Sequence, residues 1–152
     1  MCTSLGRVSW ESKNMLCECI HIQIRRFRNA RNRISAYAFS LAGGKGSGAY
    51  FQEKVYPGQW IMVAFVIDSR PSTGWPNGYI AIYKNGQLRR SRVSLAQFNV
   101  TPEASDAPFR VGTRDLESFF EEAIGKIAVY NSVLSEQDIL ATYNAMVPPG
   151  NS

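Results

Sequence analysis

The sequence predicts an all-β protein, an antiparallel sandwich of two sheets with one short C-terminal helix. Three observations lead to this prediction. Short apolar segments recur along the chain between clusters of Gly, Pro, Asn and Ser. Only one segment, near the C-terminus, has helical periodicity, so the alternation of strands and helices that builds parallel sheets is missing. An Asn-Gly pair at residues 85–86 predicts a tight hairpin.

Length and composition fit one domain. A chain of 152 residues that is 45% apolar can form its own hydrophobic core. We expect residues 1–152 to form a single domain, with residues 1–14 and 147–152 irregular. No run of about eighteen apolar residues occurs, which predicts no membrane span. No secretory signal is visible, because charged residues interrupt the N-terminal segment.

The first predicted strands lie over residues 16–24 and 34–41. In the first of them, isoleucines alternate with polar residues, as in a half-buried strand, and the alternation fails near Arg25, where the strand should end or bulge. The glycine-rich stretch 43–48 predicts a hairpin connection to a strand over residues 49–52. It lacks the Gly-Lys-Ser/Thr ending of a phosphate-binding loop.

The middle of the chain predicts the centre of the sandwich. Residues 60–67 are almost wholly apolar, which favours a central strand with Trp60 in the core. Residues 79–83 form the next predicted strand. The Asn-Gly pair that follows favours a type I′ turn, and the return strand should start at Leu88.

The C-terminal part predicts two more strands, over residues 109–112 and 125–131, and then the helix. Ser135 can cap this helix together with Asp138 three residues later. The predicted apolar face of the helix consists of Ile139, Leu140, Tyr143 and Met146.

Charge is distributed unevenly. Residues 1–92 carry 14 Lys or Arg against 4 Asp or Glu, whereas residues 93–152 carry 3 against 8. Such basic clusters attract sulfate, phosphate or carboxylate polymers, so an anionic polysaccharide is one candidate partner. A solvated edge of the domain, or ion pairs with the acidic C-terminal part, explains these basic clusters equally well. The basic clusters are Arg25, Arg26, Arg28, Arg31 and Arg33, and then Arg89, Arg90 and Arg92.

Several segments resemble a known family. Residues 58–64 with Asp68, followed by residues 80–86, resemble the paired strands of laminin-G-like and concanavalin A-like domains, and residues 109–112 and 125–131 resemble their closing strands. The order agrees over roughly residues 34–146. The strand that usually opens such domains is not visible before residue 14. The resemblance implies a jelly-roll sandwich and an extracellular or cell-surface location.

Metal binding stays open at this point. Calcium occurs in the family that the chain resembles, but the sequence does not fix the relative geometry of Asp68, Asp106 and Asp115. The cysteines give no sign of a metal site, because zinc needs about four ligands, and His21 adds only one to the neighbouring pair Cys17 and Cys19. We interpret the three cysteines, which are Cys2, Cys17 and Cys19, as free thiols.

The long loop over residues 69–78 is the candidate contact surface for a glycan. Trp75 lies between Gly74 and Pro76, where an exposed indole could stack on the face of a sugar, with Asn77 and Ser72 as hydrogen-bonding partners. The alternative is that this loop tryptophan folds back over the core. The predicted ligand-binding residues are Ser72, Trp75, Asn77, Arg89, Arg90 and Arg92.

Catalysis is disfavoured. A retaining glycoside hydrolase needs two carboxyl groups roughly 5 Å apart, and the only acid-dense segment, with Asp115, Glu117 and Glu121, does not match the acidic strand of such enzymes. His21, Gln23 and Arg25 bring to mind a polysaccharide lyase, but the sequence does not place the further groups that lyase chemistry needs.

We therefore expect a carbohydrate-binding module rather than an enzyme. The alternative is a structural or protein-interaction module of a larger assembly or adhesin. Nucleic-acid binding is disfavoured, because Phe27 is the only aromatic residue within the arginine cluster that could stack on bases.

Overall fold

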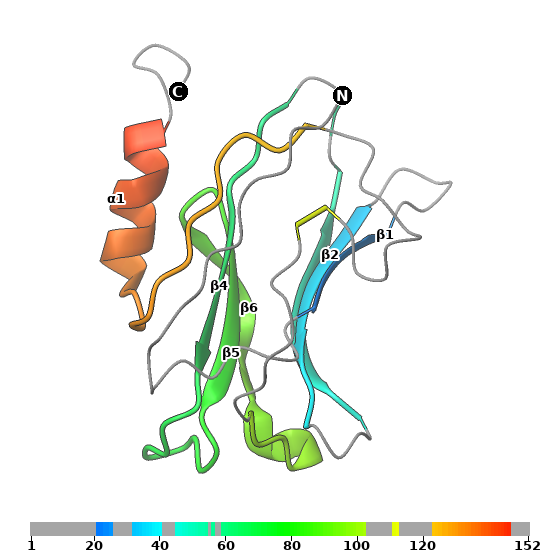
Figure 1. Cartoon of the computed structure of the whole chain (residues 1–152), viewed down its shortest axis with the longest axis vertical. Helices are drawn as coiled ribbons and strands as arrows, with labels where there is room; N and C mark the ends of the chain where they lie inside the picture. The colour runs from blue at the N-terminus through cyan, green and yellow to red at the C-terminus, as the bar shows by residue number, and fades with distance from the viewer. Residues whose placement is uncertain are drawn as a thin grey trace.

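In the part of the chain that the structure describes, two three-stranded antiparallel sheets lie face to face, with one helix outside (Figure 1). This confirms a mostly β protein with a C-terminal helix. The computed structural model describes residues 21–25, 32–40, 45–54, 56, 59–102, 111–112 and 123–146.

The first sheet contains strands β1 (His21–Arg25), β2 (Asn32–Ala38) and β3 (Ser47–Glu53) in sequential order. The described part of β1 reaches Arg25, and the predicted end or bulge of the strand there borders residues 26–31, which lie outside the described residues. β2 pairs with β3 from Asn32 opposite Glu53 to Ala38 opposite Ser47, which fits the predicted hairpin.

The second sheet contains strands β4 (Val63–Asp68), β5 (Tyr79–Lys84) and β6 (Gln87–Ser94), also in sequential order. Asn85 and Gly86 join β5 to β6, and their φ angles of 51° and 77° are those of the predicted type I′ turn. The Asn85 Oδ1 accepts a hydrogen bond of 3.0 Å from the Met62 amide, and the Asn85 amide donates one of 2.9 Å to the Met62 carbonyl. The turn is thereby bonded to the start of β4.

Alternate residues of both sheets point into the space between them and form the core. A short 3₁₀ helix, η1 (Leu95–Phe98), closes one end of this space, where the Ser47 hydroxyl donates to the Leu95 carbonyl over 3.2 Å. The buried core residues are Ile34, Ala36, Ala38, Ala49, Phe51, Ile80, Ile82, Leu95 and Val100.

The C-terminal helix α1 (Glu136–Met146) covers the outer face of the second sheet (Figure 1). The predicted cap is confirmed, because the Ser135 hydroxyl accepts from the Asp138 amide while the Asp138 carboxylate accepts from the Ser135 amide. The Ser135 hydroxyl also donates to the Asp138 carboxylate over 2.6 Å, and this bond, together with the one from the Ser135 amide, holds the pKa of Asp138 below its usual value. Ile139 is buried against a second apolar cluster that includes Val66, Ala81 and Tyr83.

The predicted apolar face of α1 is only partly correct. Ile139 is 1% exposed, but Leu140 and Met146 are each 43% exposed. A single residue of this helix is therefore buried in the sandwich, because α1 lies on a flat sheet face and contacts it along a narrow line.

Two further predictions are wrong. Trp60 is 68% exposed and precedes β4, whereas the fully buried aromatic residue of this sheet is Tyr83, which is 2% exposed and lies in the cluster under α1. Residues 125–131 form no strand, although they follow the expected sequence pattern. Of the predicted strand over residues 109–112, only Val111 and Gly112 lie within the described residues, and they form a bend.

Candidate functional site

The loop between β4 and β5, residues 69–78, is compact rather than open. Ser72 and Trp75 exchange two backbone hydrogen bonds of 3.0 and 2.9 Å, and the Gly78 amide donates to the Trp75 carbonyl over 2.9 Å. At the start of the loop, the Arg70 guanidinium binds both carboxylate oxygens of Asp68, at 2.8 and 2.9 Å. These bonds fix the position from which Trp75 projects.

Trp75 packs against an aromatic partner on the sheet. Its ring centroid lies 5.5 Å from that of Tyr79, at an angle of 54°. The Arg92 guanidinium lies 5.1 Å from the centroid of the same Tyr79 ring. We call Trp75, Tyr79 and Arg92 the aromatic rim. The structure thus brings together two predicted site residues through a tyrosine that the sequence did not identify.

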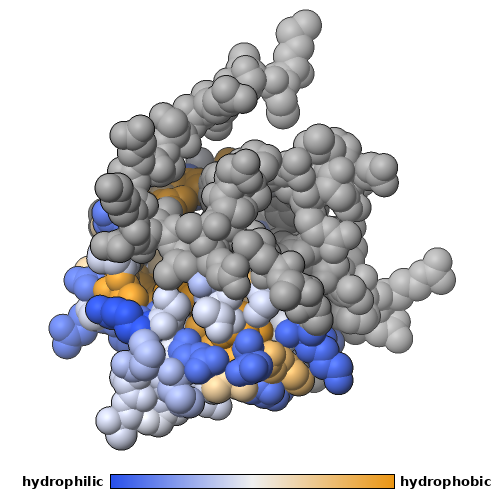
Figure 2. All heavy atoms as spheres, turned by 60° about the horizontal axis from the view of Figure 1, so that its bottom comes forward, coloured by the Kyte–Doolittle hydropathy of each residue, from blue (hydrophilic) through white to orange (hydrophobic). Residues whose placement is uncertain are grey.

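The surroundings of the aromatic rim are polar. Ser72 is exposed and Asn77 half-buried in the same loop, and Arg92 donates a hydrogen bond of 2.8 Å to Glu136 at the start of α1. Figure 2 shows this end of the molecule, where hydrophilic residues surround hydrophobic patches. Trp75 is half-buried, so one part of its ring packs on Tyr79 and the remainder faces solvent.

A bulge in β6 sends its three arginines to three different places. Ile80 pairs with Val93 and Ile82 pairs with Arg89, which leaves extra residues on β6 between these pairs. Arg90 lies in this bulge with a φ of 63°, a left-handed conformation that is uncommon outside glycine. Arg92 faces Tyr79, Arg89 faces Glu53, and Arg90 faces Tyr50. The three arginines of this predicted basic cluster therefore contact three different residues.

Arg89 belongs to a polar cluster at one end of the space between the sheets. The Lys84 ammonium donates to Glu53 over 2.7 Å, and the Arg89 Nε lies 3.3 Å from the other oxygen of Glu53. The hydrogen bond from Lys84, together with the charges of Lys84 and Arg89, holds the pKa of Glu53 below its usual value of 4.5 despite some burial.

This lowered pKa predicts a loss of stability in acid. Ionised Glu53 stabilises the folded state fully above pH 4.5, and this contribution disappears as the pH falls through the lower pKa of the folded state. In urea titrations at several pH values below 5, we expect the stability of the wild type to fall more steeply than that of Glu53→Gln. Because Glu53 is 35% exposed at its side chain, the difference should be about 1 kcal/mol or less. Parallel curves for the two proteins would contradict the assignment.

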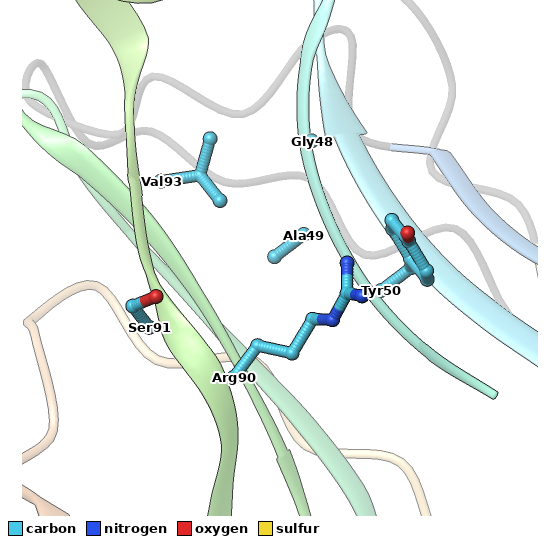
Figure 3. Close-up of a pocket in the computed structure, with 6 residues that line it drawn as sticks. All are labelled: Gly48, Ala49, Tyr50, Arg90, Ser91 and Val93. Carbon is cyan, nitrogen blue, oxygen red and sulfur yellow. The ribbon is translucent and has the colours of Figure 1, made fainter. Parts of the chain in front are cut away.

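Arg90 lines a groove between the neighbouring edges of the two sheets. Figure 3 shows its side chain extending from β6 toward Tyr50 on β3, with Ala49 and Val93 facing each other across the gap. The guanidinium carbons of Arg90 and Arg33 lie 4.2 and 3.9 Å from the centroid of the Tyr50 ring. The groove has a volume of about 290 Å³ and is lined by Gly48, Ala49, Tyr50, Arg90, Ser91 and Val93.

Tyr50 and Arg33 were not among the predicted site residues, although Arg33 lay in the basic cluster. The alternation of β3 could have indicated the position of Tyr50, because Ala49 and Phe51 are buried in the core while Tyr50 points away from it. No sequence pattern showed that Arg90 would reach it from the other sheet.

Within the ranges that the structure describes, no three His, Cys, Asp or Glu side chains gather as a metal site would require. No helix there is long and apolar enough to cross a membrane. The remaining candidates lie outside the described residues, and these are Asp106, Asp115, Glu117, Glu121, Phe27 and the three cysteines.

The comparisons with known proteins agree with the two-sheet architecture. A family model described as the concanavalin A-like lectin/glucanases superfamily, of the laminin G type, matches residues 10–140. None of the curated proteins and none of the solved structures compared with the chain matches it. The family match spans most of the 152 residues and includes both sheets and the start of the helix, and the chain therefore belongs to the concanavalin A-like lectin/glucanase superfamily.

Proposed function

We propose that this chain is a non-catalytic carbohydrate-binding module that contacts a glycan at the aromatic rim. The observation that carries the proposal is the placement of Trp75, which stands on Tyr79 beside Arg92 at one end of the second sheet. The part of the indole that faces solvent supplies an apolar surface for a sugar ring, and the loop supplies the Ser72 hydroxyl and the Asn77 amide. The jelly-roll topology and extracellular setting implied by the family are consistent with this role.

The four carboxylates of the described residues are bonded in ways that do not suit the acid of a glycoside hydrolase. The described part of the chain contains four, and each binds a cation or the helix cap: Glu53 with Lys84, Asp68 with Arg70, Glu136 with Arg92, and Asp138 with Ser135. For three of them these partners lower the pKa. A glycoside hydrolase needs a carboxyl group whose pKa is raised, so that it can donate a proton.

Titration with neutral oligosaccharides tests the aromatic rim. In calorimetry against a panel of tetrasaccharides, we expect Trp75→Ala to weaken the binding of any neutral sugar by about tenfold or more, because truncating a central aromatic contact costs about 2 kcal/mol or more. Trp60→Ala is the matched control, since Trp60 is exposed and lies outside the rim. Equal affinity of the wild type and Trp75→Ala would place the sugar elsewhere.

A protein-interaction module is the second candidate, and one observation favours it. Trp60 and the segment over residues 123–130 expose a series of large apolar side chains, and Trp60 lies close to Gly125 of that segment. Such contiguous apolar surface is typical of interaction sites. If no glycan of the panel binds the wild type, this function becomes the better assignment. The exposed residues are Trp60, Ile124, Ile127, Val129 and Tyr130, at 68%, 46%, 45%, 37% and 49%.

A further inference from the structure

We propose that the groove between β3 and β6 binds one acidic sugar residue, through a carboxylate or sulfate group held by Arg90 and Arg33. This site is separate from the aromatic rim, because Arg90 and Arg92 leave β6 toward different partners. The two proposals can therefore fail independently.

Two cations that form no ion pair with a carboxylate of the described residues meet at Tyr50. All four carboxylates of the described residues are bonded elsewhere, so neither Arg33 nor Arg90 forms an ion pair with any of them. The Tyr50 ring offsets part of the repulsion between the two guanidinium groups by cation–π attraction. Stacking occupies the faces of a guanidinium and leaves its N–H donors in the plane. Arg33 uses one of these donors to bind the Tyr37 hydroxyl over 2.6 Å, so the anion would meet the donors of Arg90 and the remaining donors of Arg33. The arrangement is suited to an anion.

The backbone is strained at the residue that reaches the groove. Arg90 has a φ of 63°, which costs a non-glycine residue about 1–2 kcal/mol, although the exposed bulge would accommodate glycine or asparagine. Bulges redirect side chains next to functional sites, and this one turns Arg90 toward Tyr50 instead of along β6 (Figure 3). The strained backbone of Arg90 thus supports a binding site at the groove independently of the charge of Arg33 and Arg90.

The walls of the groove favour a sugar over other polyanions. Ala49 and Val93 supply apolar contact, and Ser91 supplies a hydroxyl. A volume of about 290 Å³ holds one sugar residue with its charged substituent. A nucleic acid would need aromatic faces for base stacking, and the Tyr50 ring is already in contact with two guanidinium groups.

Calorimetry with defined probes tests the proposal on the full chain. The probes are a sulfated disaccharide, a tetragalacturonate that carries only carboxylates, neutral cellotetraose and a thymidine oligonucleotide. We expect the wild type to bind the sulfated or the carboxylated probe, with affinity that falls as salt is added. Arg90→Asn, which tolerates the left-handed backbone, should lose about tenfold or more. Arg90→Lys should lose less, because it keeps the charge but not the planar donors.

The controls distinguish a specific binding site from nonspecific electrostatic attraction of the probe to the basic protein. Lys126→Gln removes the same charge from an exposed position outside the groove and should bind like the wild type. In spectra of the ¹⁵N-labelled wild type, the amides of Gly48, Ala49, Tyr50 and Ser91 should shift with the acidic probe, a readout that needs no variant. Any of four results would overturn the proposal. These are wild-type affinity of Arg90→Asn for the acidic probe, an equal loss of affinity in Lys126→Gln, groove amides that do not shift, and tighter Arg90-dependent binding of the oligonucleotide.

Discussion

Gly78→Ala is expected to lower the free energy of unfolding by about 2–5 kcal/mol. Gly78 has a φ of 88°, and a Cβ atom there would lie 1.8 Å from the carbonyl oxygen of Asp68. That oxygen belongs to the backbone at the end of β4, so it cannot rotate away as a side chain would. The Gly78 amide and carbonyl are also bonded, to Trp75 and to Leu95, so a displacement would disturb both the loop and η1.

Gly74→Ala is the matched control for this substitution. Gly74 lies in the same loop with a φ of 82°, but a Cβ atom there would have nothing within 4 Å. Gly74→Ala should lower the free energy of unfolding by only about 1–2 kcal/mol, the conformational cost of a side chain at a left-handed φ. Urea unfolding followed by circular dichroism measures both. If the two variants lose the same stability, the loop moves aside at Gly78 and the close approach to Asp68 does not matter.

Ile139→Ala should be nearly as damaging, at about 2–5 kcal/mol, because Ile139 is the one residue of α1 that is fully buried against the second sheet. Leu140→Ala removes a similar side chain from the next position, which is 43% exposed, and should cost about 1 kcal/mol or less. Thermal and urea unfolding of the two variants give the comparison. A larger loss in Leu140→Ala would show that the helix is held by its contact with Gly86 rather than by Ile139.

Local signals predicted much of the fold. The Asn85-Gly86 turn and the Ser135 cap each depend on residues within a few positions of one another, and the structure confirms them. The two antiparallel sheets followed from the spacing of apolar runs and turns, since short connections favour pairing between neighbouring strands.

Burial and the candidate site were harder to predict, because they depend on contacts between distant segments. Trp60 stands in an apolar run, but the run begins before β4, so its side chain is not on the core face. The groove at Tyr50 needs a residue of β3 and a bulge of β6, and a sequence does not show which strand edges become neighbours. Trp75 was found because a loop tryptophan is conspicuous, whereas its partner Tyr79 looked like an ordinary strand residue.

The bulge in β6 also bears on self-association. Among the described strands, β6 forms an edge of its sheet, and an edge with regularly spaced amides and carbonyls can recruit the same strand from a second molecule. The extra residues between Val93 and Arg89 interrupt that spacing, and Arg90 brings its charge to the interruption. A strand of another copy would find neither a regular hydrogen-bonding ladder nor a neutral surface there, so this edge is protected against aggregation by the same distortion that directs Arg90 to Tyr50.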